Sequence, residues 1–319
     1  MMFDVTAMGE LLIDFACREV DAAGYPTMKA NPGGAPGNLL AALNCYGCKT
    51  AFLGKVGDDA FGRMLVGTMK NAGIETRGIL MDNTVFTTLA FVTFDETGNR
   101  SFSFARKPGA DTQIRFEELD LSLIDDCRDF HFGTLSLTGE PARAATQQAV
   151  AYAKEKGKII SFDPNLRKPL WDDLEEAKKQ ILWGLEQADI VKISDEEVEF
   201  LWGCGAEEGA RILHEEYGVT LAFVTLGPKG CRYSNGKEWG EVETPKGLNV
   251  IDTTGAGDIF GGSVLSRILL SGKEISEITG AELKDMTRFA CCAASLSTQR
   301  SGGITSVVPM EDVLALVKA

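Results

Sequence analysis

A turn of small residues that opens directly onto an apolar segment constrains the fold of this chain more than any other feature. Residues 252–258 read Asp-Thr-Thr-Gly-Ala-Gly-Asp, and residues 259–265 read Ile-Phe-Gly-Gly-Ser-Val-Leu. The pattern predicts a loop followed by a helix, whose first backbone N–H groups, at Gly255, Ala256 and Gly257, have no partner within the helix. Because these groups lie at the positive end of the helix dipole, they would form a cradle for a phosphate group.

Asp258, in the first turn of this helix, would stand beside the phosphate cradle. An acidic residue at such a position often serves only as a cap or complements the helix dipole, and short glycine motifs also form ordinary tight loops. Beside an anion pocket, however, a second negative charge needs a task, and accepting the proton of a hydroxyl group is the obvious one. The motif therefore predicts phosphoryl transfer to an alcohol, with Asp258 as the general base.

The composition is that of a globular protein with an excess of acidic residues. The chain has 319 residues, of which 44% are hydrophobic, and this is ample for a large buried core. Its 46 acidic and 32 basic residues give a net charge of −14, which argues against a general affinity for nucleic acid or for an anionic membrane. We expect a cytoplasmic location, because the N-terminus has no basic leader and no apolar run approaches a spanning length.

A second glycine-rich segment lies near the start of the chain. Residues 31–38 read Asn-Pro-Gly-Gly-Ala-Pro-Gly-Asn, and the second proline suits the first turn of a helix. Gly33 and Gly34 would let the backbone approach a ligand closely, and Asn38 offers an amide at the mouth of that site. Upstream, Asp14 is a carboxylate inside an apolar stretch, where a charge needs a partner or a role.

The middle of the chain alternates between strand and helix patterns. The predicted strands are 129–132, 158–162, 190–193 and 220–226, and the predicted helices are 140–156, 172–187, 195–202 and 206–217. Repeated units of this kind imply a mainly parallel sheet with helices on both faces. In such sheets, ligands bind beyond the carboxyl ends of the strands.

Two segments depart from this alternation. Residues 87–106 combine alternating apolar residues with a polar turn, which predicts a β-hairpin appended to the sheet as a lid. Residues 18–32 are polar and read as irregular. No composition shift or linker divides the chain, so we expect a single domain over residues 1–319.

Together, and in this order, the two glycine motifs resemble those of the carbohydrate kinase family named for ribokinase and the minor phosphofructokinase. Residues 33–38 match its N-terminal sugar-binding signature, and residues 252–258 match its C-terminal catalytic signature. The resemblance covers nearly the whole chain. It implies a ribokinase-like α/β fold, with a mostly parallel central sheet flanked by helices. A small β-sheet lid is implied as well, built from residues 11–31 and 87–106.

The resemblance also implies roles for individual residues in the chemical step and in binding the sugar. Asp258 would be the general base, and Gly255, Ala256 and Gly257 would form the anion hole for the transferred phosphoryl group. Binding of the sugar is implied for Asp14, Gly33, Gly34 and Asn38.

Further residues are implied to bind ATP and metal ions. Contacts to ATP are implied for Lys192, Thr225, Gly227 and Gly230. Glu197 would help to organise a water-bound Mg²⁺, although many relatives have Asn where this chain has Ser194. The zone in which relatives bind a monovalent cation, here K⁺, comprises Asp252, Thr254, Ser297, Arg300, Gly302 and Ser306.

Within the family, two segments resemble fructokinases, in particular the bacterial enzymes. These are residues 104–111 and 162–171, while Ala35 stands where ribokinases have a lysine, which disfavours ribose. The resemblance implies ATP-dependent phosphorylation of the primary hydroxyl group of D-fructose to fructose 6-phosphate. Hydrogen-bond donors near the sugar would come from Arg106, Asn165 and Arg167.

Three alternatives stay open. The related 2-keto-3-deoxygluconate kinases hold a carboxylate with arginines, often with a tyrosine near the hairpin, where this chain has Phe104. A sugar-binding regulatory protein would keep the fold without the chemistry, although Gly255, Gly257 and Asp258 are all present. A nicotinamide dehydrogenase needs a G-x-G-x-x-G motif after its first strand, which residues 8–13 do not offer. The lid is also a candidate surface for a homodimer.

Overall fold

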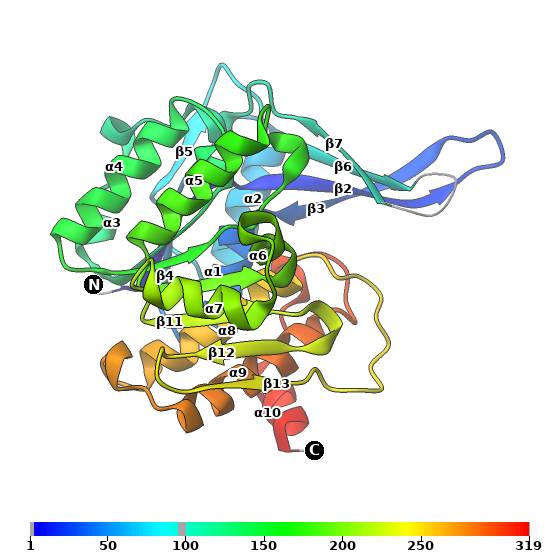
Figure 1. The fold of residues 1–319 in the computed structure, drawn as a ribbon. Coiled ribbons are helices and arrows are strands. Elements are labelled where there is room, and N and C mark those ends of the chain that lie inside the picture. Colours follow the sequence, from blue (N-terminus) through cyan, green and yellow to red (C-terminus); the bar gives the residue numbers. More distant parts are fainter. Residues whose placement is uncertain (1–2, 95–99, 319) are drawn as a thin grey trace.

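The computed structural model describes residues 3–94 and 100–318. Within these residues, nine strands form one large sheet (Figure 1). They are β1 (Phe3–Met8), β4 (Thr50–Gly57), β5 (Ile79–Asp82), β8 (Cys127–Gly133), β9 (Ile159–Asp163), β10 (Ile190–Ser194), β11 (Leu221–Thr225), β12 (Cys231–Ser234) and β13 (Trp239–Val242). Their order is β13-β12-β11-β10-β9-β8-β1-β4-β5. The strands from β11 to β5 run parallel, and β12 and β13 add an antiparallel edge.

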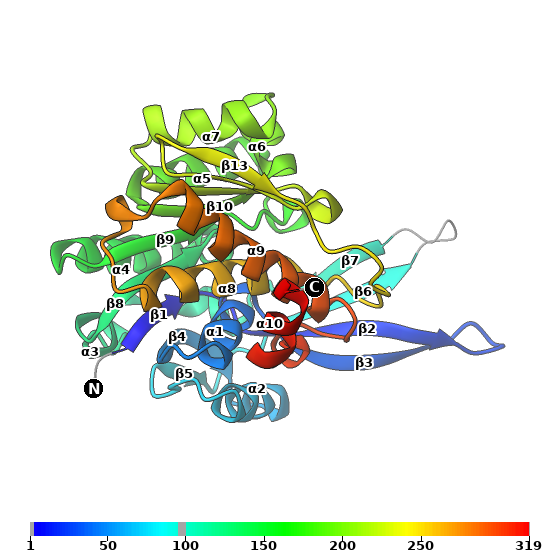
Figure 2. The same cartoon turned by 90° about the horizontal axis from the view of Figure 1, so that it is seen from below.

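Helices cover both faces of the large sheet (Figure 2). On one face lie α1 (Ala35–Cys45), α2 (Ala60–Asn71), α8 (Ala256–Leu270) and α9 (Gly280–Ser297). On the other face lie α3 (Ser122–Asp125), α4 (Ala142–Glu155), α5 (Leu174–Gln187), α6 (Asp195–Trp202) and α7 (Ala206–Glu215). The last helix, α10 (Met310–Lys318), packs against α9. Among the described residues, no helix is both long enough and apolar enough to cross a membrane.

The strands inside the sheet are apolar because both of their faces are covered. Every residue of β4 is buried, for example, as expected for a parallel strand between two layers of helices. In the same core, the rings of Phe132 and Phe162 on neighbouring strands lie 4.7 Å apart. The strands and helices predicted between residues 128 and 226 are confirmed, with ends that differ by a few residues.

A smaller sheet of four strands extends from one end of the large sheet (Figure 1). Its strands are β2 (Leu12–Val20), β3 (Pro26–Gly33), β6 (Leu89–Phe94) and β7 (Arg100–Ala105), in the order β3-β2-β6-β7. The hairpin strands predicted within residues 87–106 are confirmed as β6 and β7, while the predicted turn at 95–99 lies outside the described residues.

The prediction that residues 18–32 are irregular is wrong. Most of this segment belongs to the ribbon of β2 and β3, which pair in an antiparallel ladder with an irregularity between Cys17 and Glu19. Residues 19–27, around the tip of the ribbon, are exposed. Because that part of the ribbon packs on no core, its strands lack the alternation of apolar and polar residues by which a half-buried strand is recognised.

Arg106 follows β7 and ties the smaller sheet to the rest of the protein. Its Nε donates to Asp111 Oδ2 at 2.8 Å, and its Nη1 and Nη2 donate at 2.8 Å to Thr138 Oγ1 and to the Leu135 carbonyl oxygen. The side chains of Arg106 and Asp111 are only 4% and 2% exposed. Breaking such a buried and hydrogen-bonded ion pair is strongly destabilising, because one charge stays buried without its partner.

The substitution Arg106→Met should therefore lower the free energy of unfolding by about 3–5 kcal/mol. A matched control is Arg63→Met, because Arg63 pairs with Asp58 at the surface, where the two side chains are 61% and 53% exposed. That loss should stay below about 1 kcal/mol. Chemical denaturation of the wild type and both variants measures the difference, and equal losses would contradict a structural role for Arg106.

Candidate active site

The N-terminus of α8 adopts the turn that the glycine motif predicts. Gly255 has φ 75°, and a Cβ atom there would lie 2.8 Å from the Cα of Gly303, so this position suits glycine alone. The Ala256 N–H donates to the Thr253 carbonyl oxygen at 3.3 Å, so one of the three predicted anion-hole groups already has a partner. A Cβ on Gly257 would lie 3.2 Å from Lys192 Nζ, which brings an ammonium group close to this turn.

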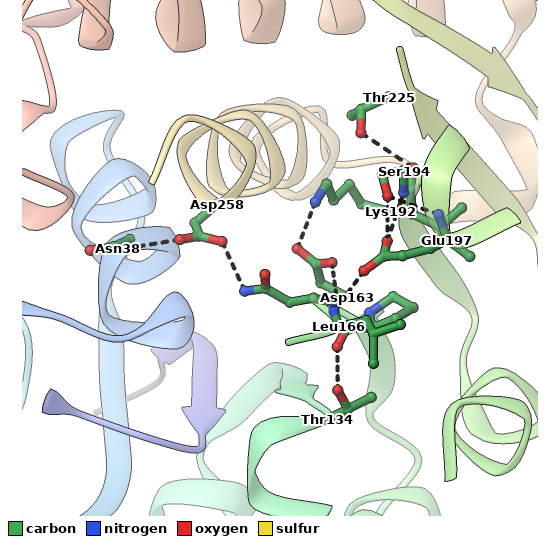
Figure 3. A network of polar contacts seen from close by, with 12 residues as sticks. Asn38, Thr134, Asp163, Leu166, Lys192, Ser194, Glu197, Thr225 and Asp258 are labelled. Atoms are coloured by element: carbon green, nitrogen blue, oxygen red, sulfur yellow. Dashed lines mark hydrogen bonds and ion pairs between the residues drawn. The ribbon is translucent and has the colours of Figure 1, made fainter. Parts of the chain in front are cut away.

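Asp258 lies in the first turn of α8, and its carboxylate is held on both sides (Figure 3). Asn38, on α1, donates through Nδ2 to Oδ2 at 2.8 Å, and Asn165, after β9, donates through Nδ2 to Oδ1 at 3.2 Å. The pKa of Asp258 is raised to about 6, mainly by burial and then by the nearby carboxylate of Asp163, against the lowering effects of the Asn38 amide, Lys192 and Arg167. A carboxylate with such a pKa is ionised at neutral pH and can still accept a proton.

Asp258 lines a cavity of about 420 Å³ between the smaller sheet and the ends of the large-sheet strands. Of the predicted site residues, those that line it are Asp14, Gly34, Asn38, Asn165, Arg167, Asp252, Thr254, Gly255 and Asp258. Four carboxyl groups and one cation, Arg167, are among the lining residues. Such a surface is suited to a ligand rich in hydroxyl groups, which donate hydrogen bonds to carboxylates.

The paired glycines let the smaller sheet approach the start of α1. Gly34 has φ 120°, and a Cβ there would lie 2.4 Å from the Glu10 carbonyl oxygen, while a Cβ on Gly33 would lie 2.3 Å from Asp14 Oδ2. The pKa of Asp14 is raised to about 6, mainly by burial and against the lowering effect of Arg167. The glycines therefore allow the Asp14 carboxyl group to stand at the wall of the cavity.

Glu10 and Asn31 also line the cavity, although neither was predicted as a site residue. Glu10 is buried, and its Oε1 accepts a hydrogen bond from the Ala35 N–H at the start of α1 at 2.7 Å. Burial raises the pKa of Glu10 to about 7, against the lowering effect of its backbone hydrogen bonds. In the sequence, this role was indicated by the position of Glu10, a charged residue between Gly9 and the apolar residues 11–13.

A second polar cluster, on the far side of Asp258, joins the ends of β9 and β10 (Figure 3). Lys192 Nζ pairs with Asp163 Oδ2 at 3.0 Å. Glu197 accepts the Leu166 N–H at 2.7 Å through Oε1, and it accepts the N–H and hydroxyl groups of Ser194 at 2.8 and 3.0 Å through Oε2. Ser194 thus caps α6 and fixes the side chain of Glu197.

The other residues predicted to bind ATP lie at the end of β11 and in the turn that follows. Thr225 Oγ1 donates to the Ile193 carbonyl oxygen at 3.4 Å. Gly227 and Gly230 have φ values of 55° and 121°, and a Cβ on Gly230 would lie 1.9 Å from the Val242 carbonyl oxygen. Both glycines therefore shape the turn between β11 and β12.

Asp252 brings together the two loops predicted to bind a monovalent cation. Its Oδ1 accepts the N–H and hydroxyl groups of Thr254 at 3.0 and 2.7 Å, and its Oδ2 accepts the Gly302 N–H at 3.1 Å. Nearby, the hydroxyl groups of Ser297 and Ser306 donate to carbonyl oxygens of their own turns, and Arg300 Nη1 donates to the Val307 carbonyl oxygen. Within residues 3–94 and 100–318, no three His, Cys, Asp or Glu side chains gather as a metal cluster.

Thirteen predicted residues do not belong to the lining of the cavity. They are Gly33, Arg106, Lys192, Glu197, Thr225, Gly227, Gly230, Ala256, Gly257, Ser297, Arg300, Gly302 and Ser306. Arg106 is the clearest case, because its guanidinium group is engaged by Asp111, Thr138 and Leu135 beside the cavity. Most of the others lie at the ends of β10 and β11, at the start of α6, or in the last turn of α9 and the loop after it.

Comparison with known proteins places this chain in a family. Residues 2–310 match the model of the pfkB family carbohydrate kinases. Fructokinase-2 of Solanum lycopersicum is 42% identical to this chain over 98% of its length and 96% of that protein.

Solved structures of related proteins also resemble the fold of this chain. A fructokinase from Xylella fastidiosa with bound ATP has a TM-score of 0.90 at 30% identity, covering 99% of this chain and 98% of that one. A Vibrio cholerae O395 fructokinase, bound to fructose, ADP and a calcium ion, has a TM-score of 0.87 at 31% identity and covers 99% of both chains. The predicted ribokinase-like fold and the predicted kinase activity are confirmed. This chain belongs to the pfkB family of carbohydrate kinases.

Proposed function

We propose that this kinase transfers the γ-phosphoryl group of ATP to the primary hydroxyl group of D-fructose and forms fructose 6-phosphate. The observation that carries the proposal is the position of Asp258, whose carboxylate is held by two amides at the wall of a 420 Å³ cavity and at the N-terminus of α8. Fructokinases at 42% identity in sequence, and at a TM-score of 0.90 in structure, support fructose as the sugar.

In the proposed reaction, the sugar binds between the smaller sheet and the strand ends, with Asp14, Gly34 and Asn38 on its path. The smaller sheet acts as a lid of the same domain, and its closure excludes water from the site. Asp258 takes the proton of the attacking hydroxyl group as the new O–P bond forms, and the bond to the ADP oxygen breaks in line with it. The N–H groups of Gly255 and Gly257 stabilise the charge on the transferred group, and the Ala256 N–H joins them when it exchanges the Thr253 carbonyl oxygen, 3.3 Å away, for a phosphate oxygen.

The lining of the cavity favours a neutral sugar over 2-keto-3-deoxygluconate. A sugar acid would bring a further negative charge to the carboxyl groups of Glu10, Asp14, Asp252 and Asp258, with Arg167 as the one cation among the lining residues. Arg106, the second arginine available to such a carboxylate, is occupied by Asp111. A regulatory protein without activity is disfavoured, because the base and the glycine turn are both intact.

The proposal predicts that fructose gives the highest kcat/KM in a panel with 2-keto-3-deoxygluconate, ribose, tagatose and adenosine, each assayed with Mg·ATP. A coupled assay of ADP release measures the rates. Dominance of the keto acid would overturn fructose as the substrate and leave the kinase intact. As a control, Asp258→Asn should remove nearly all turnover while fructose binding, measured by calorimetry, stays close to that of the wild type.

For metal ions, we propose that Mg²⁺ accompanies ATP and that Glu197 contacts it through water. The two oxygens of Glu197 offer about four acceptor positions, and three described hydrogen bonds leave one for a water molecule. For K⁺ we propose the zone around Asp252 and Gly302, where the Asp252 carboxylate joins two loops by accepting the Gly302 N–H at 3.1 Å. When bound, Mg²⁺ neutralises charge on the phosphates of ATP.

Chelation of Mg²⁺ with excess EDTA should therefore abolish ADP release, and added MgCl₂ should restore it. Replacing K⁺ by tetramethylammonium at constant ionic strength should lower kcat several-fold, because that ion is too large to enter a site of loop oxygens. Full activity in EDTA would remove the proposal for Mg²⁺. An unchanged kcat without K⁺ would remove the proposal for the monovalent site.

For its assembly, we propose a homodimer formed through the lid. The β2–β3 ribbon exposes apolar side chains at its outer end, where Val20 is 60% and Tyr25 is 72% exposed. A second lid packed on this surface would bury them. Light scattering at micromolar protein should give about twice the 34.4 kDa of one chain, and Tyr25→Asp should shift the mass toward that of one chain. If the wild-type protein showed the mass of one chain, the dimer would be excluded.

The location of the protein in the cytoplasm stays a prediction.

A further inference from the structure

Asn165 holds one oxygen of the Asp258 carboxylate from an unusual backbone conformation. Its φ is 45°, and within residues 3–94 and 100–318 it is the one residue other than glycine with a positive φ. Asparagine tolerates this left-handed region better than most residues, but the conformation still costs free energy and persists only where its surroundings impose it. The side chain is buried, and its Nδ2 lies 3.2 Å from Asp258 Oδ1.

The loop that carries Asn165 is fixed at three consecutive points (Figure 3). Asp163 Oδ1 accepts the Asn165 N–H at 3.1 Å, Thr134 donates its hydroxyl hydrogen to the Pro164 carbonyl oxygen, and Glu197 accepts the Leu166 N–H at 2.7 Å. These partners come from three neighbouring elements, the ends of β9 and β8 and the start of α6. The left-handed conformation of Asn165 is thus imposed by contacts with the ends of β8 and β9 and with α6.

The opposite oxygen of Asp258 is held in a similar way. Asn38 reaches Oδ2 from the first turn of α1, and the start of α1 is tied to the strand region by the hydrogen bond from the Ala35 N–H to Glu10. On each side, then, an asparagine amide contacts the base, and a buried glutamate anchors the backbone that carries this asparagine. With both oxygens held, the carboxylate is prevented from rotating about its χ2 angle.

We propose that Asn165 is a positioning residue, which aims the Asp258 carboxylate at the hydroxyl group of the sugar, and that the 163–166 loop is built to hold it there. The inference rests on the proposed role of Asp258 as general base. It differs from the sugar-binding role predicted for Asn165, because the amide that would contact the sugar is directed at the base instead. Loss of the amide should therefore change kcat more than sugar affinity, since a base displaced by about 1 Å can cost up to 10²-fold in rate.

The variant for the test is Asn165→Gly, because glycine accepts φ 45° without strain and removes only the side chain. We expect kcat for the best sugar to fall about 10- to 100-fold, with the dissociation constant of the sugar within about threefold. The matched control is Lys168→Ala on the same loop, an exposed residue whose kcat should stay within about twofold of the wild type. A loss confined to sugar affinity, or an unchanged kcat in Asn165→Gly, would overturn the proposal.

A second measurement separates positioning from a general loss of structure. The Asn165 amide stabilises the ionised form of Asp258, so its removal should raise the pKa of the base and shift the acidic limb of kcat/KM upward by about 0.5–1 pH unit. Asn165→Asp, which puts a like charge beside the base, should shift it further. The other charges that face Asp258 are unchanged in both variants: Asp163, Lys192 and Arg167, together with Asp14 across the cavity.

The same shift is measurable without any substrate, which keeps this test apart from that of the proposed function. In protein labelled with ¹³C at the aspartate carboxyl carbons, the Asp258 signal is assigned by its absence in Asp258→Asn. Its titration midpoint should rise in Asn165→Gly and stay unchanged in Lys168→Ala. An unchanged titration midpoint in Asn165→Gly would overturn the proposal that Asn165 positions the Asp258 carboxylate, whether or not fructose is the substrate.

Discussion

The proposed reaction depends on one buried carboxylate, that of Asp258, remaining ionised and able to accept a proton. Burial alone would push Asp258 toward its neutral form, and the neighbouring Asp163 acts in the same direction. The Asn38 amide, together with Lys192 and Arg167, opposes that tendency, and the Asn165 amide donates a hydrogen bond to the other oxygen of the carboxylate. The balance leaves the pKa at about 6. A carboxylate with a much lower pKa would be too weak a base to take a proton, and one with a much higher pKa would already be protonated at neutral pH. The rest of the fold can be understood as the means of bringing these partners to one point.

The parallel sheet supplies that convergence. Asp163 and Lys192 come from the ends of β9 and β10, Asn165 from the loop after β9, and Asn38 from α1, so the contacts of Asp258 span more than 200 residues of sequence. Parallel strands carry all their following loops at one edge of the sheet. Helix α8 then needs only to point its N-terminus at that edge, and the packing of α8 between α1 and α9 on one face of the sheet provides this direction.

The sequence was sufficient for the elements with strong local signals and insufficient where a role depends on distant partners. The strands between 128 and 226 and the glycine turn at 255 were recognised, because buried parallel strands and positive φ leave marks in local sequence. The local pattern missed the β2–β3 ribbon, since its tip packs on no core, whereas the family resemblance implied a lid from residues 11–31. Arg106 resembled a ligand-binding residue, but its partners Asp111, Thr138 and Leu135 lie 5, 32 and 29 residues further along the chain, and only the folded structure brings them together. The position of Glu10 depends likewise on a backbone N–H 25 residues away, and the proposed role of Asn165 depends on a carboxylate 93 residues away.

Glu10 and Glu197 also help to explain how an acidic protein can bind ATP close to Asp258, the proposed general base. Glu10 and Glu197 are both directed at backbone N–H groups, of Ala35 and Leu166, so part of their negative charge is compensated within the fold. The positive potential is meanwhile concentrated in the α8 N-terminus, Lys192 and Arg167, all close to the site. A net charge of −14 is therefore compatible with ATP binding, because the field at a phosphate is set by groups a few ångströms away, and distant surface carboxylates are screened by salt.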